Sequence, residues 1–160
     1  MRISHRTATA TAGLAAAALA LTGAAPGSAA ASPAAAPTLT SIRAAHHTGY
    51  DRIVFGFTSD RLASHNTAYV ARLIADPSGK VIPIRGRAIL RIVFTPAAAH
   101  NSKGRPTSPT SITFSLPEIK QVKKAGDFEG YVSYGIGLAK HEPYTVHILA
   151  GRVYLDIRTP

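Results

Sequence analysis

The stretch from Gly49 to Phe57 constrains the fold more than any other part of the chain. It reads Gly-Tyr-Asp-Arg-Ile-Val-Phe-Gly-Phe, a turn glycine followed by β-branched and aromatic residues, which is typical of a β-strand. Alternation along a strand places Ile53, Phe55 and Phe57 on one face, which we expect to lie in the core. Arg52 lies on the opposite face, so its charge requires either water or an acidic partner.

The rest of the chain repeats this pattern of short alternating stretches, separated by glycine, proline, asparagine and aspartate. The expected strands cover residues 39–46, 49–57, 68–75, 81–84, 88–95, 112–114, 119–122, 131–138, 144–149 and 152–158. Residues 95–100 should form one helical turn, with Thr95 as N-cap and Pro96 at the first helical position. The sequence therefore predicts an all-β domain, a β-sandwich with one short helical turn.

The first 31 residues have the pattern of a signal peptide. Basic residues come first, an apolar run covers Leu14–Leu21, and small residues continue to Ala31. The apolar run is shorter than the roughly 20 residues that a transmembrane helix needs, and the chain has no cysteine for lipid attachment. We therefore expect a secreted protein without a transmembrane anchor, with an Ala/Pro linker over residues 32–37 and one domain over residues 38–160.

Composition narrows the possible partners. The chain has 18 Lys and Arg against 8 Asp and Glu, so removal of Arg2 and Arg6 with the signal peptide leaves a net charge of about +8. A secreted basic protein can meet anionic wall polymers, lipid head groups and nucleic acid. Its basic residues are scattered rather than clustered, which argues against a specific nucleic-acid site. Without cysteines, core packing must stabilise the fold.

The segment Gly126–Gly130 carries the two carboxylates that most resemble a catalytic pair. Asp127 and Glu129 could meet the separation of about 5–9 Å that glycosidases use, and His100 could join them in space. However, both acids would share one environment, whereas an acid and a nucleophile need separated pKa values. We expect them instead to bind turn amides or to pair with Arg52. No metal-ligand spacing of histidines and no nucleophile motif is present, so we expect no catalysis, metal or cofactor.

Tyrosines offer a second kind of contact, because exposed aromatic rings can stack on sugar rings. Tyr131 and Tyr134 are three residues apart in one expected strand, so they point to opposite faces and at most one belongs to the core. A buried tyrosine with a hydrogen-bonded hydroxyl is the alternative for each. The glycines of Gly135-Ile136-Gly137 are expected where another part of the backbone packs closely.

Several motifs, taken in order, resemble the AMIN-like domains of secreted actinobacterial proteins and lipoproteins. They are Gly49–Phe57, Gly86-Arg-Ala-Ile-Leu90, Thr95-Pro-Ala-Ala-Ala-His100, Gly126-Asp-Phe-Glu-Gly130, Tyr134-Gly-Ile-Gly-Leu138 and Val153-Tyr-Leu-Asp156. The resemblance extends from Leu39 to Arg158. One departure is Tyr134, which stands where the family pattern has tryptophan.

This resemblance implies a β-sandwich of two small antiparallel sheets. Related AMIN domains are attached to cell-wall amidases and secretion proteins, target the envelope and bind peptidoglycan. The expected function is therefore a secreted, non-catalytic module that binds peptidoglycan or an anionic wall polymer. The candidate binding residues are Arg52, His100, Asp127, Glu129, Tyr131 and Tyr134. Two alternatives remain open: a wall hydrolase or metal-dependent enzyme using Asp127, Glu129 and His100, and a protein–protein interaction module that pairs through a strand edge.

Overall fold

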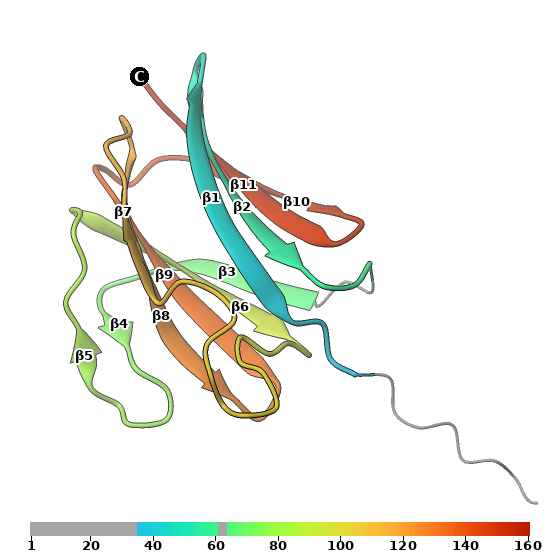
Figure 1. Ribbon diagram of the computed structural model, residues 1–160. Helices are drawn as coiled ribbons and strands as arrows, with labels where there is room; N and C mark the ends of the chain where they lie inside the picture. The colour runs from blue at the N-terminus through green and yellow to red at the C-terminus, as the bar shows by residue number, and fades with distance from the viewer. Residues whose placement is uncertain (1–34, 61–63) are drawn as a thin grey trace, which may run out of the picture. The chain divides into compact units, whose positions relative to one another are not determined.

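A computed structural model describes residues 35–60 and 64–160 (Figure 1). The strands are β1 (Leu39–His47), β2 (Tyr50–Phe57), β3 (Ser64–Val70), β4 (Leu73–Ile74), β5 (Val81–Ile82), β6 (Ala88–Thr95), β7 (Ser111–Thr113), β8 (Ile119–Phe128), β9 (Tyr131–Leu138), β10 (Tyr144–Leu149) and β11 (Arg152–Arg158). The expected signal peptide, residues 1–31, and the first part of the expected linker lie outside the described residues. Pro37, at the end of that linker, is buried, and its carbonyl accepts a hydrogen bond from the Ala98 amide at 3.0 Å.

The strands form two antiparallel sheets that face each other, so the predicted β-sandwich is confirmed (Figure 1). One sheet has four strands in the order β1-β2-β11-β10, and the other has five in the order β3-β6-β9-β8-β7. The alternation predicted from the sequence places Ile53 and Phe55 in the core, both fully buried. From the opposite sheet, Phe94 and Tyr134 meet Phe55, with ring centroids 5.1 Å and 5.8 Å away. These aromatic contacts join the two sheets at the centre of the core.

A small β4–β5 hairpin lies on the outer face of the five-stranded sheet. Its Leu73 is fully buried against Gly135 of β9, and the Arg85 carbonyl that follows β5 lies over Gly137. A side chain at either glycine would collide with these atoms. The expectation that another backbone approaches the β9 glycines closely is confirmed at Gly137, whereas at Gly135 the Leu73 side chain fills the space. This cover explains why β9 is buried on both faces.

A buried carboxylate connects the two sheets at one end of the sandwich. Asp51 of β2 is fully buried. Its Oδ2 accepts hydrogen bonds from the amides of Glu118 and Ile119, at 2.7 Å and 3.0 Å, where β8 begins. Its Oδ1 lies 2.8 Å from Nδ1 of His46 on the neighbouring strand. The burial of Asp51 was not predictable from the sequence, because no sequence pattern marks an aspartate beside a glycine turn as buried.

The predicted helical turn over residues 95–100 is wrong. Thr95 ends β6, and Ala98 forms a parallel bridge with Thr38 instead of a turn of helix. The reason is burial: Ala97 and Ala99 fill the core, and the Ala98 carbonyl accepts from the Leu39 amide at 2.7 Å. No helix occurs within residues 35–60 and 64–160. The described segments accordingly contain no helix with the length and apolarity of a membrane span.

Two larger differences from the sequence prediction concern strand bounds. The expected strand over residues 68–75 is two strands, β3 and β4, in different sheets. The expected short strand over residues 119–122 continues to Phe128, so the expected turn at 126–130 shortens to Glu129 and Gly130. This longer strand carries Asp127 and Phe128 to the end of the β8–β9 hairpin.

Candidate functional site

The tip of the β8–β9 hairpin gathers three of the predicted binding residues, Asp127, Glu129 and Tyr131. Phe128 and Tyr131 are directly opposite each other across the two strands, and only Glu129 and Gly130 connect them. Both connecting residues have positive φ, 49° for Glu129 and 79° for Gly130, as two-residue hairpins with the native strand twist require. Glycine adopts this conformation freely, whereas glutamate does so rarely. An uncommon backbone conformation at an exposed residue is a reason to look for function there.

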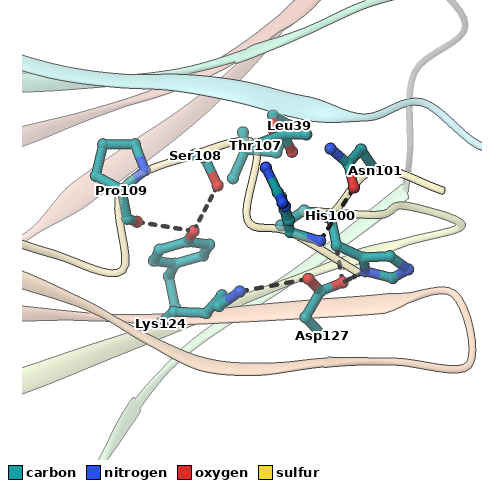
Figure 2. Close-up of polar contacts among 11 residues, drawn as sticks. Leu39, His100, Asn101, Thr107, Ser108, Pro109, Lys124 and Asp127 are labelled. Carbon is teal, nitrogen blue, oxygen red and sulfur yellow. Dashed lines mark hydrogen bonds and ion pairs between the residues drawn. The ribbon is translucent and has the colours of Figure 1, made fainter. Parts of the chain in front are cut away.

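Asp127 organises the side of the hairpin that faces His100 (Figure 2). Its Oδ1 lies 2.9 Å from His100 Nδ1 and accepts a hydrogen bond from the Ala99 amide at 3.0 Å. Its Oδ2 accepts from Lys124 Nζ at 3.3 Å. Burial by itself would raise the pKa of Asp127, but these hydrogen bonds and the lysine charge outweigh it and hold the pKa below its ordinary value. Asp127 is therefore an anion that fixes the chain segment 99–100 to the hairpin.

A hollow of about 500 Å³ opens beside this cluster, lined by His100, Lys124, Asp127, Phe128 and Glu129 among others. His100, which the sequence left free to join either acid, contacts Asp127 at 2.9 Å, and Glu129 lines the same space. The side chains present one imidazole, one ammonium and one aromatic ring beside two carboxylates. Such a mixture suits hydrogen bonding to a polar, uncharged or zwitterionic ligand.

A second hollow, of about 250 Å³, lies on the other side of the hairpin tip and is lined by Asp76, Arg91, Val93, Phe128, Glu129 and Tyr131. The side chains of Phe128 and Tyr131 are exposed by 53% and 56%. Beside them, Arg91 Nη2 donates to Asp76 Oδ2 at 2.8 Å, and Ser133 Oγ donates to the same oxygen at 2.9 Å. Phe128 and Glu129 line both hollows, so the hairpin tip projects between them.

Two predicted binding residues lie elsewhere. Tyr134 is fully buried, with its hydroxyl 2.9 Å from Ser108 Oγ and donating to the Pro109 carbonyl at 3.1 Å. Burial raises its pKa to about 12. Tyr134 is therefore a core residue and not a surface contact, and its prediction as a binding residue is corrected accordingly. The same hydrogen bonds anchor Ser108 and Pro109, shortly before β7 begins.

Arg52 lies on the outer face of the four-stranded sheet, away from the hairpin acids. Its Nε and Nη2 donate to the two carboxylate oxygens of Asp156 at 2.6 Å and 2.7 Å. These hydrogen bonds raise the pKa of Arg52 further above its ordinary value. The expectation that Arg52 pairs with Asp127 or Glu129 is wrong, because Asp156 is its direct cross-strand neighbour in the same sheet, whereas both other acids belong to the β8–β9 hairpin of the other sheet.

The sequence did not predict several contributors to the hairpin site, among them Phe128, Lys124, Asp76 and Arg91. Phe128 could have been found from its place opposite Tyr131, if the strand end had been set at 128 instead of 122. Asp76 and Arg91 come from other strands and loops, so only the sheet order brings them together. Within the described residues, no group of three His, Asp or Glu side chains is arranged to hold a metal ion.

The comparison with known families agrees with this architecture. A family model described as the AMIN-like domain matches residues 37–159. The chain belongs to the AMIN-like domain family. The match includes the eleven strands of the described residues and both hollows at the hairpin tip. No curated protein and no solved structure matches the chain.

Proposed function

We propose that this AMIN-like protein is a secreted, non-catalytic binding module that associates with the cell wall and contacts peptidoglycan through the tip of its β8–β9 hairpin. Membership of the AMIN-like family supports a cell-wall-related binding module. The signal-peptide pattern of residues 1–31, which also fits an actinobacterial exported protein, supports secretion. The proposal that the ligand is the glycan of peptidoglycan depends on the side chains at the hairpin tip.

The single observation that carries the proposal is the exposed pair Phe128 and Tyr131. Each ring is more than half exposed, although burial of an aromatic side chain is normally favourable. The pair borders a hollow in which the Asp76–Arg91 ion pair and Glu129 supply hydrogen-bond donors and acceptors. Apolar rings that contact one face of a sugar, with charged groups that bind its hydroxyls, are the combination that carbohydrate recognition needs.

Cosedimentation with purified peptidoglycan sacculi tests this assignment. Replacement of both rings, Phe128→Ser with Tyr131→Ser, should weaken binding by about tenfold or more, because truncating a central aromatic contact residue commonly costs more than about 1 kcal/mol. The matched control is Ile148→Ser with Leu149→Ser, which removes two other exposed apolar side chains, 41% and 49% exposed, from the end of β10. The control should bind like the wild type. Equal binding by the two double variants would contradict the proposed site.

A second arm separates glycan contact from simple charge attraction. Attraction between the basic protein and anionic wall polymers is screened within about 8 Å at physiological salt, so it should fade as salt rises. Contacts with the glycan itself should persist. Binding that survives both high salt and removal of the anionic polymers supports a peptidoglycan site, and binding lost in either treatment supports only an electrostatic surface.

A wall hydrolase is the second candidate, because His100, Asp127 and Glu129 do converge on one hollow. Two features favour binding instead. Both oxygens of Asp127 are already engaged, and its lowered pKa is the opposite of what a general acid needs near neutral pH. Release of dye-labelled fragments from sacculi tests the alternative. We expect no release by the wild type, and release that Glu129→Gln abolishes would establish an enzyme.

A further inference from the structure

The outer face of the four-stranded sheet carries a second charged surface, distinct from the hairpin site. Alternation along β1, β2 and β11 turns four arginines outward, Arg43, Arg52, Arg152 and Arg158. Asp156 is the one acidic residue on the outward face of these strands, and Arg52 occupies both of its oxygens. Across residues 35–60 and 64–160, the other three arginines have no ion pair, and all three are exposed.

Two hollows lie on this face. The first, of about 380 Å³, has Arg43 and Arg152 on its walls, and its other lining residues include Ser41, Gly56 and Asp60. Arg43 is opposite Val54, and Arg152 is opposite Gly56, so β2 separates the two guanidinium groups. Gly56 leaves room for the Ser41 hydroxyl, which a side chain there would displace. Two guanidinium groups and a hydroxyl can surround one phosphate group, and their two positive charges exceed the single negative charge of Asp60 in the same hollow.

The second hollow, of about 230 Å³, lies toward the opposite end of the strands and is lined by Tyr50, Thr145, Asp156 and Arg158 among others. Arg152 and Arg158 both belong to β11 and are six residues apart. At about 3.4 Å per residue, roughly 20 Å of strand separates them. A small anion could fill one hollow, whereas an extended polymer could occupy both at once. Its affinity would then be higher, because binding in one hollow raises the effective concentration of the polymer at the other.

The geometry points to a linear polyol phosphate, a flexible polymer whose repeats are joined by phosphodiesters, as the ligand of this face. The inference deepens the proposed function, since it assigns the anionic-polymer contact to residues separate from the hairpin. A nucleic acid is the less suitable occupant, because single-stranded binding relies on free aromatic faces. Here Tyr154 is covered by Arg52 at 4.2 Å and stacked on His147 at 4.7 Å, and Tyr50 is stacked on His47 at 4.9 Å.

The test uses the purified protein and two probes, poly(glycerol phosphate) and oligo-dT of matched charge. Arg43→Gln with Arg152→Gln removes two positive charges from the hollow that Ser41 and Gly56 also line. Lys103→Gln with Arg105→Gln removes the same charge from an exposed loop and is the matched control. Affinity is measured from low to high salt, since each phosphate contact contributes about 0.7 to the slope of log affinity against log salt.

We expect the sheet variant to bind poly(glycerol phosphate) about tenfold more weakly, with a slope reduced by about 1 or more. The loop control should change affinity by less than about threefold and leave the slope within about 0.3. Arg43→Lys with Arg152→Lys keeps the charge but loses the bidentate geometry, so an intermediate affinity is expected. Equal weakening by sheet and loop variants would overturn the proposal, as would oligo-dT binding as tight as that of the polyol phosphate.

The hairpin variant makes failure of this inference distinguishable from failure of the proposed function. Phe128→Ser with Tyr131→Ser should retain its affinity for poly(glycerol phosphate) while losing affinity for stripped sacculi. Loss of both affinities would mean that the hairpin, and not the sheet face, binds the polyanion, and would overturn the assignment of this surface.

Discussion

Replacing Asp51 with alanine should destabilise the fold more than replacing any exposed acid, because Asp51 accepts hydrogen bonds across the sandwich. The substitution leaves the amides of Glu118 and Ile119 buried without an acceptor. An unsatisfied buried donor costs about 1–3 kcal/mol, so the two amides together amount to about 2–6 kcal/mol. Domains of this size are stable by about 5–15 kcal/mol in total. A large fraction of the stability would therefore be lost.

Urea unfolding followed by circular dichroism measures this effect. Asp60→Ala, at an exposed residue, is the control and should change the unfolding free energy by less than about 0.5 kcal/mol. Asp51→Asn keeps one acceptor oxygen but loses the charge, and hydrogen bonds to charged groups are about twice as strong as neutral ones. Its unfolding free energy should therefore lie between those of Asp51→Ala and the control. If the unfolding free energy of Asp51→Ala lies within about 1 kcal/mol of that of the control, the hydrogen bonds of Asp51 across the sandwich do not stabilise the fold.

Three further predictions concern other contacts. Because the pKa of Asp127 is lowered in the folded protein, its carboxylate stabilises the fold at pH values above the unfolded pKa, near 3.8, and this stabilisation is lost as pH falls through the lower folded pKa. Asp127→Asn should therefore reduce the dependence of the unfolding free energy on pH in the acid range. An unchanged pH dependence would contradict this. Asn101 Oδ1 accepts from the amides of Lys103 and Arg105, so Asn101→Ala should speed trypsin cleavage after Lys103, measured by mass spectrometry. Gly137→Ala should lower the unfolding free energy by about 1–3 kcal/mol, because the added methyl group would collide with the backbone carbonyl of Arg85.

Strand positions were predictable where local chemistry and burial agree. The alternation of Ile53 and Phe55 predicted a core face, because these side chains can only be buried. The expected strands over residues 144–149 and 152–158 have the bounds of β10 and β11. The 95–100 segment failed because its helix signals are local, whereas its alanines fill the core and its backbone pairs with residues near β1. A tertiary contact decided the outcome there, against local propensity.

The site was predictable only in part. His100, Asp127, Glu129 and Tyr131 gather around one hairpin because three of them are neighbours in sequence, and His100 meets Asp127 at 2.9 Å. The arginine partner was not predictable, since pairing depends on which strand neighbours β2. Strand order is set by the whole set of sheet contacts, and β11 lies about a hundred residues further along the chain.

The most direct measurement of the central claim is an NMR titration of the ¹⁵N-labelled protein with soluble peptidoglycan fragments released by muramidase digestion. If the hairpin tip binds the glycan, the largest amide shifts should fall on Phe128, Glu129 and Tyr131 and on their neighbours in the two hollows, and they should persist at high salt. The outer face of the four-stranded sheet should remain unshifted at high salt, where charge attraction to its arginines is screened. Shifts confined to that face, or no shift at saturating fragment, would contradict the account.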